Sequence, residues 1–471
     1  MATAINSDLW RTSGAAAAAT APPDRLPPGR LLAFSAVALP VAAAQMPLNV
    51  YLPAIFAQHY GVPLAVLGTI FLIEKIWGAI ADPIIGTLSD RTRSRFGRRR
   101  IWIAAGGAVF GLSALLLFFP LWGVTPLYLG LVLFAFYLGW SMIQIPFLAW
   151  SGEISHDYNE RTRVATYQLV VGSAALLLVL VLPTLVDQVR PGDGPLKLGV
   201  MGGLLLVTLV PSLVLTLRAF PEPPLPEAPA QRLPFGKAVR LVASNRLLMR
   251  ILASDFAVTL GQNIRGTLFV FFVSAYMGLP HWASGLFLLQ FIFGISAGPI
   301  WMKIGYRLGK HRAAVAGELV QVAINLGLLF VMPGQLGLLV ALTVAQGFAQ
   351  GSGNLMLRSM VADVADAHRL ATGEDRTALF YSVFSISMKA AMAAAVGIAL
   401  PLVAWLGFDP ASPSNSPDAL KGLLLVFALG PALAHLASAV LVHGFPLDAA
   451  AHARIRASLD QRDTTPNPIQ A

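Results

Sequence analysis

The sequence predicts an all-α membrane protein with twelve transmembrane helices, arranged as two pseudo-symmetric six-helix bundles. The first observation behind this prediction is composition. The 471-residue chain is 56% hydrophobic and 12% charged, whereas soluble domains carry about 25% charged residues. Second, the apolar residues gather in twelve runs, each long enough to cross a bilayer, which takes about 20 residues. Third, short motifs of the first half recur in the second half.

The twelve runs define the expected organisation of the chain. A Pro-rich stretch at 220–247 is expected to link the two bundles, and the segments 1–30 and 447–471 are expected to be disordered tails. Residues 1–30 lack the apolar core of about 7–15 residues that a signal peptide needs. The expected spans are 31–57, 64–89, 101–122, 126–150, 164–187 and 197–219 in the first bundle (31–219), then 248–277, 282–304, 313–333, 336–360, 377–406 and 420–446 in the second (248–446).

The distribution of basic residues predicts the orientation. Most Arg and Lys residues lie in the gaps after even-numbered spans, and the opposite gaps hold few. Because cytoplasmic loops carry the excess of positive charge, both termini are expected in the cytoplasm of a multi-pass inner-membrane protein. The net charge of +10 is therefore interpreted as loop charge, and no nucleic-acid partner is expected.

The sequence lacks the features that mark several other function classes. Since it contains no Cys, disulfides, cysteine-based zinc sites and thiol nucleophiles are excluded. Motifs of metalloproteases, phosphate loops and nucleophile elbows are absent from it, as is a selectivity-filter loop. We therefore expect neither an enzyme nor a channel, and no cofactor or bound metal.

The internal repeat indicates a particular kind of membrane protein. The second run is followed by ADPIIGTLSDRTRSRFGRRRIWI, and the eighth by AGPIWMKIGYRLGKHRAAV. A second pair of related segments is GEISHDYNERTRVATYQ and ADVADAHRLATGEDRTALFYS. Parallel six-helix repeats related by an axis along the membrane normal are typical of transporters, with the binding site between the repeats.

These motifs resemble those of the glycoside–pentoside–hexuronide:cation symporters, the melibiose permease-like group of the major facilitator superfamily. The matching segments are DPIIGTLSDRTRSRFGRRR, IQIPFLAW, ERTRVATYQ, MVADVADAHRLATGEDRTALFYS and SMKAA, in this order and over almost the whole chain. The resemblance implies a major facilitator fold, alternating access, a coupling cation and a glycoside or uronide as the small-molecule substrate. A monomer in the lipid bilayer is expected.

The resemblance also implies a cation site, which this chain retains only in part. The family uses two carboxylates of the second helix, an intervening Asn and a hydroxyl of the fourth helix. This chain keeps Asp82 and Ser141 but has Gly78 and Ala81 at the other two positions. Sodium needs several oxygen ligands, whereas one partly buried carboxylate can exchange a proton. We therefore expect H⁺ rather than Na⁺ as the coupling cation.

Two further charged residues are candidates for coupling. Lys389 matches a family lysine and can pair with Asp82, either as a switch or as a static ion pair. Glu74 lies eight residues before Asp82 and so on the same helix face. It is expected either to supply a replacement carboxylate or to be neutralised by Lys75.

The expected substrate contacts depart from the family pattern as well. The helix-4 aspartate appears as Gln144, and the helix-5 arginine falls at Gln168 or Leu169. Animal relatives of the family carry lysolipids, so an amphipathic anion or lysolipid is an alternative substrate. Arg265 can bind an anionic cargo or be structurally paired. The remaining candidates, whose alternatives are interhelical hydrogen bonding or membrane anchoring, are Gln262, Gln346, Gln350, Asn354, Tyr381 and Trp150.

Charged residues at the cytoplasmic ends of the helices are expected to form a gate. In this interpretation the loop arginines bind helix C-terminal carbonyls and acids across the two halves, which latches the outward-open state. The alternative is that they only determine topology. The predicted gate residues are Asp90, Arg98, Arg99, Arg100, Glu153, Asp157, Asp363 and Asp366.

The expected mechanism is proton-coupled symport. Asp82 takes up a proton, Lys389 is released, and residues 31–219 rock against residues 248–446. A drug or metabolite exporter and a non-transporting solute sensor are the alternatives.

Overall fold

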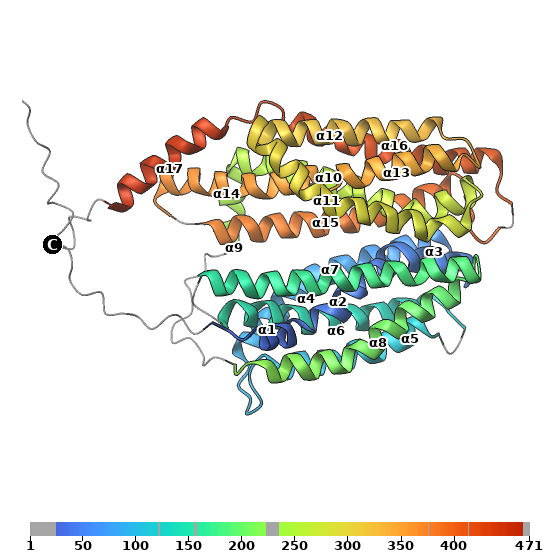
Figure 1. Ribbon diagram of the computed structural model, residues 1–471, viewed down its shortest axis with the longest axis horizontal. Helices are drawn as coiled ribbons and strands as arrows, with labels where there is room; N and C mark the ends of the chain where they lie inside the picture. Colours follow the sequence, from blue (N-terminus) through green and yellow to red (C-terminus); the bar gives the residue numbers. More distant parts are fainter. Residues whose placement is uncertain are drawn as a thin grey trace, which may run out of the picture.

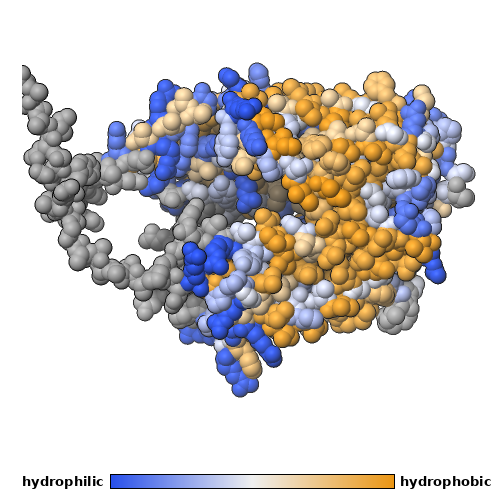
Figure 2. Space-filling model, in the orientation of Figure 1, coloured by the Kyte–Doolittle hydropathy of each residue, from blue (hydrophilic) through white to orange (hydrophobic). Residues whose placement is uncertain are grey.

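The computed structural model describes residues 25–120, 123–154, 158–222, 235–374, 376–412 and 414–464. Within these ranges twelve helical spans are long and apolar enough to cross a membrane, and no residue is in a strand. The predicted all-α class and the number of spans are confirmed. The helices form two bundles side by side (Figure 1), and apolar side chains cover the middle of the surface (Figure 2).

The first bundle begins with an irregular span. Proline removes a backbone donor and disrupts the preceding helical turn, and Pro40, Pro47 and Pro53 divide this span into short segments. The other five spans are single long helices. The elements are α1 (Pro28–Ser35), α2 (Ala38–Ala43), η2 (Pro47–Tyr51), α3 (Leu52–Gln58), α4 (Leu64–Arg91), α5 (Arg100–Phe118), α6 (Pro126–Glu153), α7 (Tyr158–Val189) and α8 (Gly194–Ala219).

A short helix, α9 (Phe235–Ser244), leads into the second bundle. This bundle repeats the six-span pattern, with short π- or 3₁₀-helical turns between the longer helices. Its elements are α10 (Arg246–Phe271), η3 (Phe272–Tyr276), η4 (Pro280–Trp282), α11 (Ala283–Leu308), α12 (Lys310–Gly327), η5 (Leu328–Phe330), α13 (Leu336–Ala349), α14 (Ser352–Thr372), α15 (Thr377–Trp405) and α16 (Pro417–Val442).

The tenth span is interrupted where the sequence predicts one continuous helix over 336–360. Gln350 is extended (ψ 137°) and Gly351 is left-handed (φ 80°), so the chain leaves the helical conformation between α13 and α14. A residue with a Cβ adopts the left-handed conformation only at a cost of about 1–2 kcal/mol. Gly351 therefore permits the break, and it places a helix end inside a membrane span.

The expected disordered tails are partly wrong. Residues 25–30 are described, and α1 already begins at Pro28. The chain from Ala449 forms α17 (Ala449–Thr464), whose His452 lies 3.1 Å from Asp366 of α14. The Ala451 N–H donates to Asp448 over 2.8 Å and so lowers the pKa of that carboxyl. This segment is helical because it is rich in alanine, is capped by Asp448 and has His452 and Arg456 close to Asp366 of α14. Residues 1–24 and 465–471 lie outside the described ranges.

The two bundles meet along a seam formed chiefly by α4 with α15 and by α7 with α11. Close contacts lie at the end of the seam away from the arginine-rich 91–100 segment, which we call the opposite end. A Cβ on Gly68 would lie 2.7 Å from Pro401 Cδ, and one on Gly285 would lie 3.7 Å from Thr184 Cγ2. Toward the arginine-rich end, called the basic end, the surface is hollowed between the bundles (Figure 2).

Candidate functional site

Three of the predicted coupling residues meet at the seam. Ser141 Oγ of α6 donates to Asp82 Oδ1 of α4 over 2.6 Å, and Lys389 Nζ of α15 donates to Asp82 Oδ2. The Asp82 side chain is 17% exposed and that of Lys389 is 38% exposed. The carboxylate of one bundle is therefore bound by an ammonium group of the other, in a place that water can partly reach.

Close helix packing positions Ser141. A Cβ on Gly139 would lie 2.5 Å from the Phe110 backbone nitrogen, so this glycine lets α6 approach α5 directly. Ser141 then lies two residues further along α6, buried against α4. The small residue and the hydroxyl together set the position of the Asp82 carboxylate.

Glu74 belongs to a different group of contacts. Lys75 Nζ lies 3.5 Å from Glu74 Oε2 and donates to the Tyr137 hydroxyl of α6 over 2.9 Å. The same ammonium group lies 4.7 Å from the centroid of the Tyr137 ring, within the range of a cation–π interaction. Of the two alternatives for Glu74, the geometry favours neutralisation by Lys75.

Gln144 continues this polar row along α6. It accepts a hydrogen bond from Trp140 Nε1, and the Trp140 ring is stacked on Tyr137 at 5.9 Å with an angle of 18°. The row thus joins Lys75, Tyr137, Trp140 and Gln144 next to the Asp82 site. An aromatic face beside an amide is suited to a ring that carries hydroxyl groups.

The predicted polar stripe of the tenth span is divided by the helix break. Gln346 is 2% exposed on α13, Gln350 is exposed at the break itself, and Asn354 lies on α14. Because the chain is not helical between them, the four-residue spacing does not place them on one helix face, and the expected stripe is wrong. Gln262 Nε2 of α10 donates to Asn354 Oδ1 over 2.9 Å, so these two amides do lie together.

Arg265 lies inside the second bundle. It is 4% exposed, its Nη1 donates to Asn325 Oδ1 of α12 over 2.8 Å, and its guanidinium lies 5.3 Å from the Phe427 ring centroid. In this conformation the side chain is held by an amide and an aromatic face. This arrangement favours structural pairing over contact with an anionic cargo.

The other predicted substrate contacts are scattered. Trp150 is fully buried against Phe34, with ring centroids 5.1 Å apart, so it offers no surface to a solute in this conformation. The Tyr381 hydroxyl donates to the Arg358 carbonyl over 3.2 Å. Gln168 is half-buried, and its Nε2 has no hydrogen-bond partner among the described residues.

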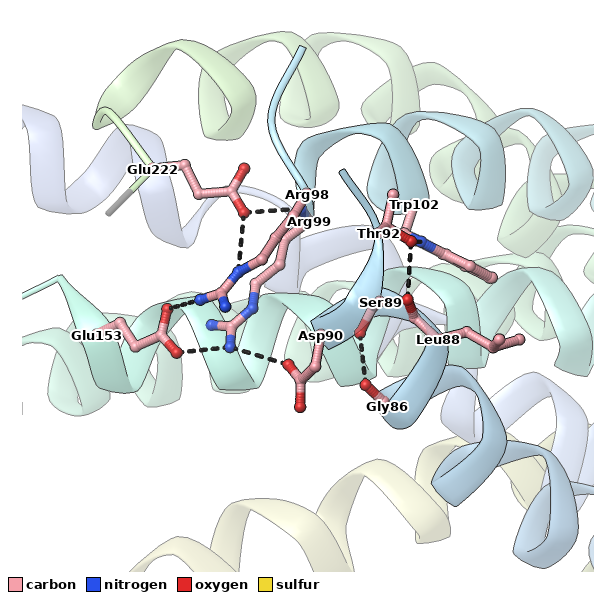
Figure 3. A network of polar contacts seen from close by, with 10 residues as sticks. All are labelled: Gly86, Leu88, Ser89, Asp90, Thr92, Arg98, Arg99, Trp102, Glu153 and Glu222. Atoms are coloured by element: carbon pink, nitrogen blue, oxygen red, sulfur yellow. Dashed lines mark hydrogen bonds and ion pairs between the residues drawn. The ribbon is translucent and has the colours of Figure 1, made fainter. Parts of the chain in front are cut away.

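The basic end of the first bundle carries a dense ion-pair network (Figure 3). Arg98 and Arg99 each donate through Nη2 to a different oxygen of Glu153 over 2.6 Å. Arg99 Nη2 also lies 3.3 Å from Asp90 Oδ1. Glu222, which the sequence prediction missed, accepts from the Arg99 backbone N–H over 2.7 Å and lies 3.6 Å from Arg98 Nε.

The gate was expected to latch the two halves in the outward-open state, and in this conformation, which is open at the basic end, its described members pair within each half. Asp363 pairs with Lys310 at 2.7 Å and Asp366 with His452 at 3.1 Å, all within the second half of the chain. Each described ion pair at the basic end thus lies within a single half, and the surface is hollowed between the bundles there (Figure 2). Arg100 Nη2 donates to the Phe220 carbonyl at the end of α8 over 2.5 Å, a helix C-terminal contact of the expected kind. Asp157 lies outside the described residues.

Buried charges of the second bundle also escaped prediction. Asp255, Glu318 and His435 are each at most 1% exposed. Their signal was present, since an ionisable residue inside an apolar run is costly and usually functional. They lie outside the five segments in which the chain resembles the family.

The fold and these contacts agree with the known proteins that the chain resembles. Residues 33–449 match the family described as MFS/sugar transport protein. The chain belongs to this family. The resemblance to glycoside–cation symporters is confirmed, and the proteins of this family are transporters, not enzymes.

Individual relatives of this major facilitator protein are distant but cover most of it. An uncharacterized symporter of Synechocystis sp. is 26% identical over 88% of this chain and 93% of its own. A putative glycoside/cation symporter of Escherichia coli is 23% identical over 83% of this chain and 86% of its own. The crystal structure of a mutant of the nucleoside transporter NupG superimposes with a TM-score of 0.64 at 14% identity, over 88% of this chain and 98% of that one.

Proposed function

We propose that this protein is a proton-coupled symporter of a small glycoside or uronide, and that its two bundles rock about the seam in alternating access. Asp82 is the proton acceptor in this mechanism, and Lys389 competes with the proton for the carboxylate. Protonation of Asp82 removes the negative charge, releases Lys389 and so loosens the contact between α4 and α15.

The contact between Asp82 and Lys389 carries the proposal. It joins the two halves by charge, its acid is partly buried, and its lysine is 38% exposed. Breaking a charge pair by neutralising one partner leaves the other charge to find a new environment, which is a large local change in free energy. Two of the oxygen ligands expected for sodium are missing, since Gly78 and Ala81 replace them, and this supports H⁺.

The loop charges suggest which side of the membrane each end of the seam faces. Basic loops favour the cytoplasmic side, so we assign the basic end, and with it both termini, to the cytoplasm. The seam is then closed on the outer side by contacts such as that of Gly68 with Pro401. The recess in Figure 2 would face inward, as in a symporter after the release of its cargo.

The row along α6 supports the proposed substrate class. Gln144 and the Trp140 and Tyr137 rings offer an amide and aromatic faces but no free acid. A family relative is named as a putative glycoside/cation symporter. A glycoside with an apolar or aromatic aglycone fits these groups, and a uronide adds a carboxylate that Lys389 can attract after its release.

The test uses purified protein in liposomes loaded with a pH-sensitive dye. 4-Nitrophenyl β-D-glucoside and 4-nitrophenyl β-D-glucuronide are the probes, and internal acidification on their addition reports coupled proton entry. Wild-type protein is expected to acidify the lumen with at least one probe, whereas Asp82→Asn is expected to lose acidification and concentrative uptake. The control is Asp409→Asn, an exposed carboxylate of the loop between α15 and α16.

Each outcome has a consequence. Asp82→Asn vesicles that remain fully concentrative and proton-dependent would refute the role of Asp82. Uptake that follows a sodium gradient at constant pH would replace H⁺ by Na⁺. Binding of a probe without counterflow would instead identify a solute sensor.

A further inference from the structure

Two buried acids of the second bundle take no part in the seam site. Asp255 of α10 is 0% exposed and Glu318 of α12 is 1% exposed. No lysine or arginine within the described ranges forms an ion pair with either carboxyl group. Because an isolated buried carboxylate is very costly, these groups need another source of stabilisation.

Both carboxyl groups meet the first turn of α14, directly after the break in the tenth span. Asn354 Nδ2 reaches Asp255 Oδ1 at 3.4 Å. A Cβ on Gly353 would lie 2.1 Å from Glu318 Oε1, so the glycine lets this carboxyl group approach the helix backbone. No side chain caps α14, and its first N–H groups have no helical partner. Broken membrane helices form ion sites in this way.

A histidine is bound to one of the two acids. His435 Nδ1 of α16 lies 2.6 Å from Glu318 Oε2, and His435 is 1% exposed. This short separation requires one proton between the imidazole and the carboxyl group, because two bare acceptors would repel each other.

Unpartnered polar atoms point to a ligand at the same place. Asp255 Oδ2 is buried without a hydrogen-bond partner among the described residues, and so is Ser352 Oγ. Ser352 packs against Gly317 of α12, where a Cβ would be 2.4 Å from Ser352 Oγ, and it directly precedes Gly353, which contacts the Glu318 carboxyl group. With a single donor at 3.4 Å, an ionised Asp255 would be poorly stabilised, whereas its protonated form is neutral.

The surrounding helices provide no compensating cation. Glu318 of α12 and His435 of α16 form one pair, and Lys389 of α15 is bound to Asp82. Two arginines lie on the same helices: Arg250 of α10 donates to the Leu441 and His443 carbonyls, and Arg358 of α14 is exposed. The nearest group of α14 is the neutral amide of Asn354. Arg265, further along α10, is held by Asn325.

We propose that the second bundle contains a proton-binding site of its own, in which Asp255 holds one proton and Glu318 shares another with His435. Only its use in coupling rests on the proposed symport, where it would raise the number of protons per cycle above one. Binding of the protons themselves does not depend on transport. The site lies on α10, α12, α14 and α16, apart from the Asp82 carboxylate of the first bundle.

Infrared spectroscopy of the purified protein tests Asp255, because a protonated carboxyl group has a C=O band that a carboxylate lacks. At neutral pH the wild type is expected to show such a band and Asp255→Asn to lose it, while Asp255→Glu restores it. The matched control is Asp187→Asn with Lys197→Met. It removes a carboxylate that is equally buried but lies 2.5 Å from a lysine, and it is expected to leave the band unchanged.

Three results would overturn the assignment to Asp255: the band persists in Asp255→Asn, it disappears in the control, or sodium chloride removes it at constant pH. The last result would show a sodium site. If Asp255→Asn does not fold, the Asp255→Glu band decides, since a side chain longer by one methylene is expected to shift the frequency.

Nuclear magnetic resonance of protein labelled with ¹⁵N-histidine tests the shared proton. The signals of His435 are those lost in His435→Gln. They are expected to move in Glu318→Gln, because the amide cannot share the proton, and unchanged signals would refute the pairing. Neither spectrum requires transport, so a failed uptake assay with intact spectra would reject the proposed function and keep this site.

Discussion

Lys389 Nζ on α15 donates to Asp82 Oδ2 on α4, so a charge pair connects the second bundle to the first beside the hydroxyl of Ser141. The two residues are 307 positions apart in the sequence. Its stability and its protonation therefore both depend on how the bundles sit against each other.

The first prediction concerns this pair. Asp82→Asn and Lys389→Met should each lower the thermal unfolding temperature in detergent, since each leaves one unpaired charge or one unpaired amide in a partly buried place. The double variant should lose less stability than the two single variants together. The difference in free energy of unfolding, the interaction energy of the cycle, should be about 0.5–3 kcal/mol. Ser141→Ala, which keeps both charges, is the control. Additive losses would mean that the two groups do not interact in solution.

A second double-mutant cycle concerns the basic end. Arg99 is buried and bonded to Glu153 at 2.6 Å, whereas Asp363 pairs with Lys310. Glu153→Gln should reduce the free energy of unfolding by about 1–3 kcal/mol, the cost of a charged hydrogen bond. The lower end of this range is expected, because Glu153 is 31% exposed and solvent screens the pair.

The effects of Glu153→Gln and Arg99→Gln on the free energy of unfolding should not add in the double variant, because the two residues contact each other. Arg99→Gln combined with Asp363→Asn should instead be additive within about 0.5 kcal/mol. Unfolding curves of the single and double variants measure both sums. Coupling between Arg99 and Asp363 would instead show that the predicted latch across the halves is populated in solution.

The helices and their number follow from the sequence because apolar length and loop charge alone determine them. Asp82, Ser141 and Lys389 were also predictable, since each occupies a matched position of the family. The contact partners of the charged residues were harder to predict. Glu153 was named as a partner of the loop arginines, and it does bind Arg98 and Arg99. Which of the four predicted acids these arginines meet depends on distances between helix ends, which no local pattern encodes.

The break in the tenth span shows another limit. Gln346, Gln350 and Asn354 have the spacing of one helix face, and this spacing is identical whether or not the helix is continuous. Glycine is common in membrane helices, so Gly351 by itself did not signal a break. The grouping of Asp255, Glu318 and His435 near this break was not predictable either, because only the fold brings α10, α12, α14 and α16 together.

A cross-link tests the closed end of the seam. The chain has no native cysteine, and Thr184 of α7 faces Gly285 of α11, with Cγ2 at 3.7 Å from a Cβ at that glycine. A cysteine sulfur at 184 can take the place of this Cγ2 and so approach a sulfur on the residue 285 Cβ. The pair Thr184→Cys with Gly285→Cys should therefore oxidise to a disulfide. Oxidation is expected to stop net uptake and reduction to restore it, while each single variant remains active. Full uptake by the oxidised protein would show that these helices need not separate during transport.

The last prediction separates contact at the seam from helix propensity, because α4 carries two glycines in different surroundings. A Cβ on Gly68 would lie 2.7 Å from Pro401 Cδ and 3.3 Å from the Val396 carbonyl, whereas one on Gly78 would meet nothing within 4 Å. A proline ring and a backbone carbonyl cannot yield cheaply, so Gly68→Ala should force α4 away from α15 at the opposite end. Gly78→Ala should only stabilise the helix, by about 0.5–1 kcal/mol.

The reporter is Ser284→Cys, a fully buried position at the opposite end, labelled with a membrane-impermeant maleimide. Labelling is expected to be several-fold faster in the Gly68→Ala background and unchanged in the Gly78→Ala background. Equal rates in the two backgrounds would mean that the Gly68 contact does not hold that end closed. Faster labelling with Gly68→Ala alone would show that the packing of one glycine against Pro401 biases the equilibrium between the two open states.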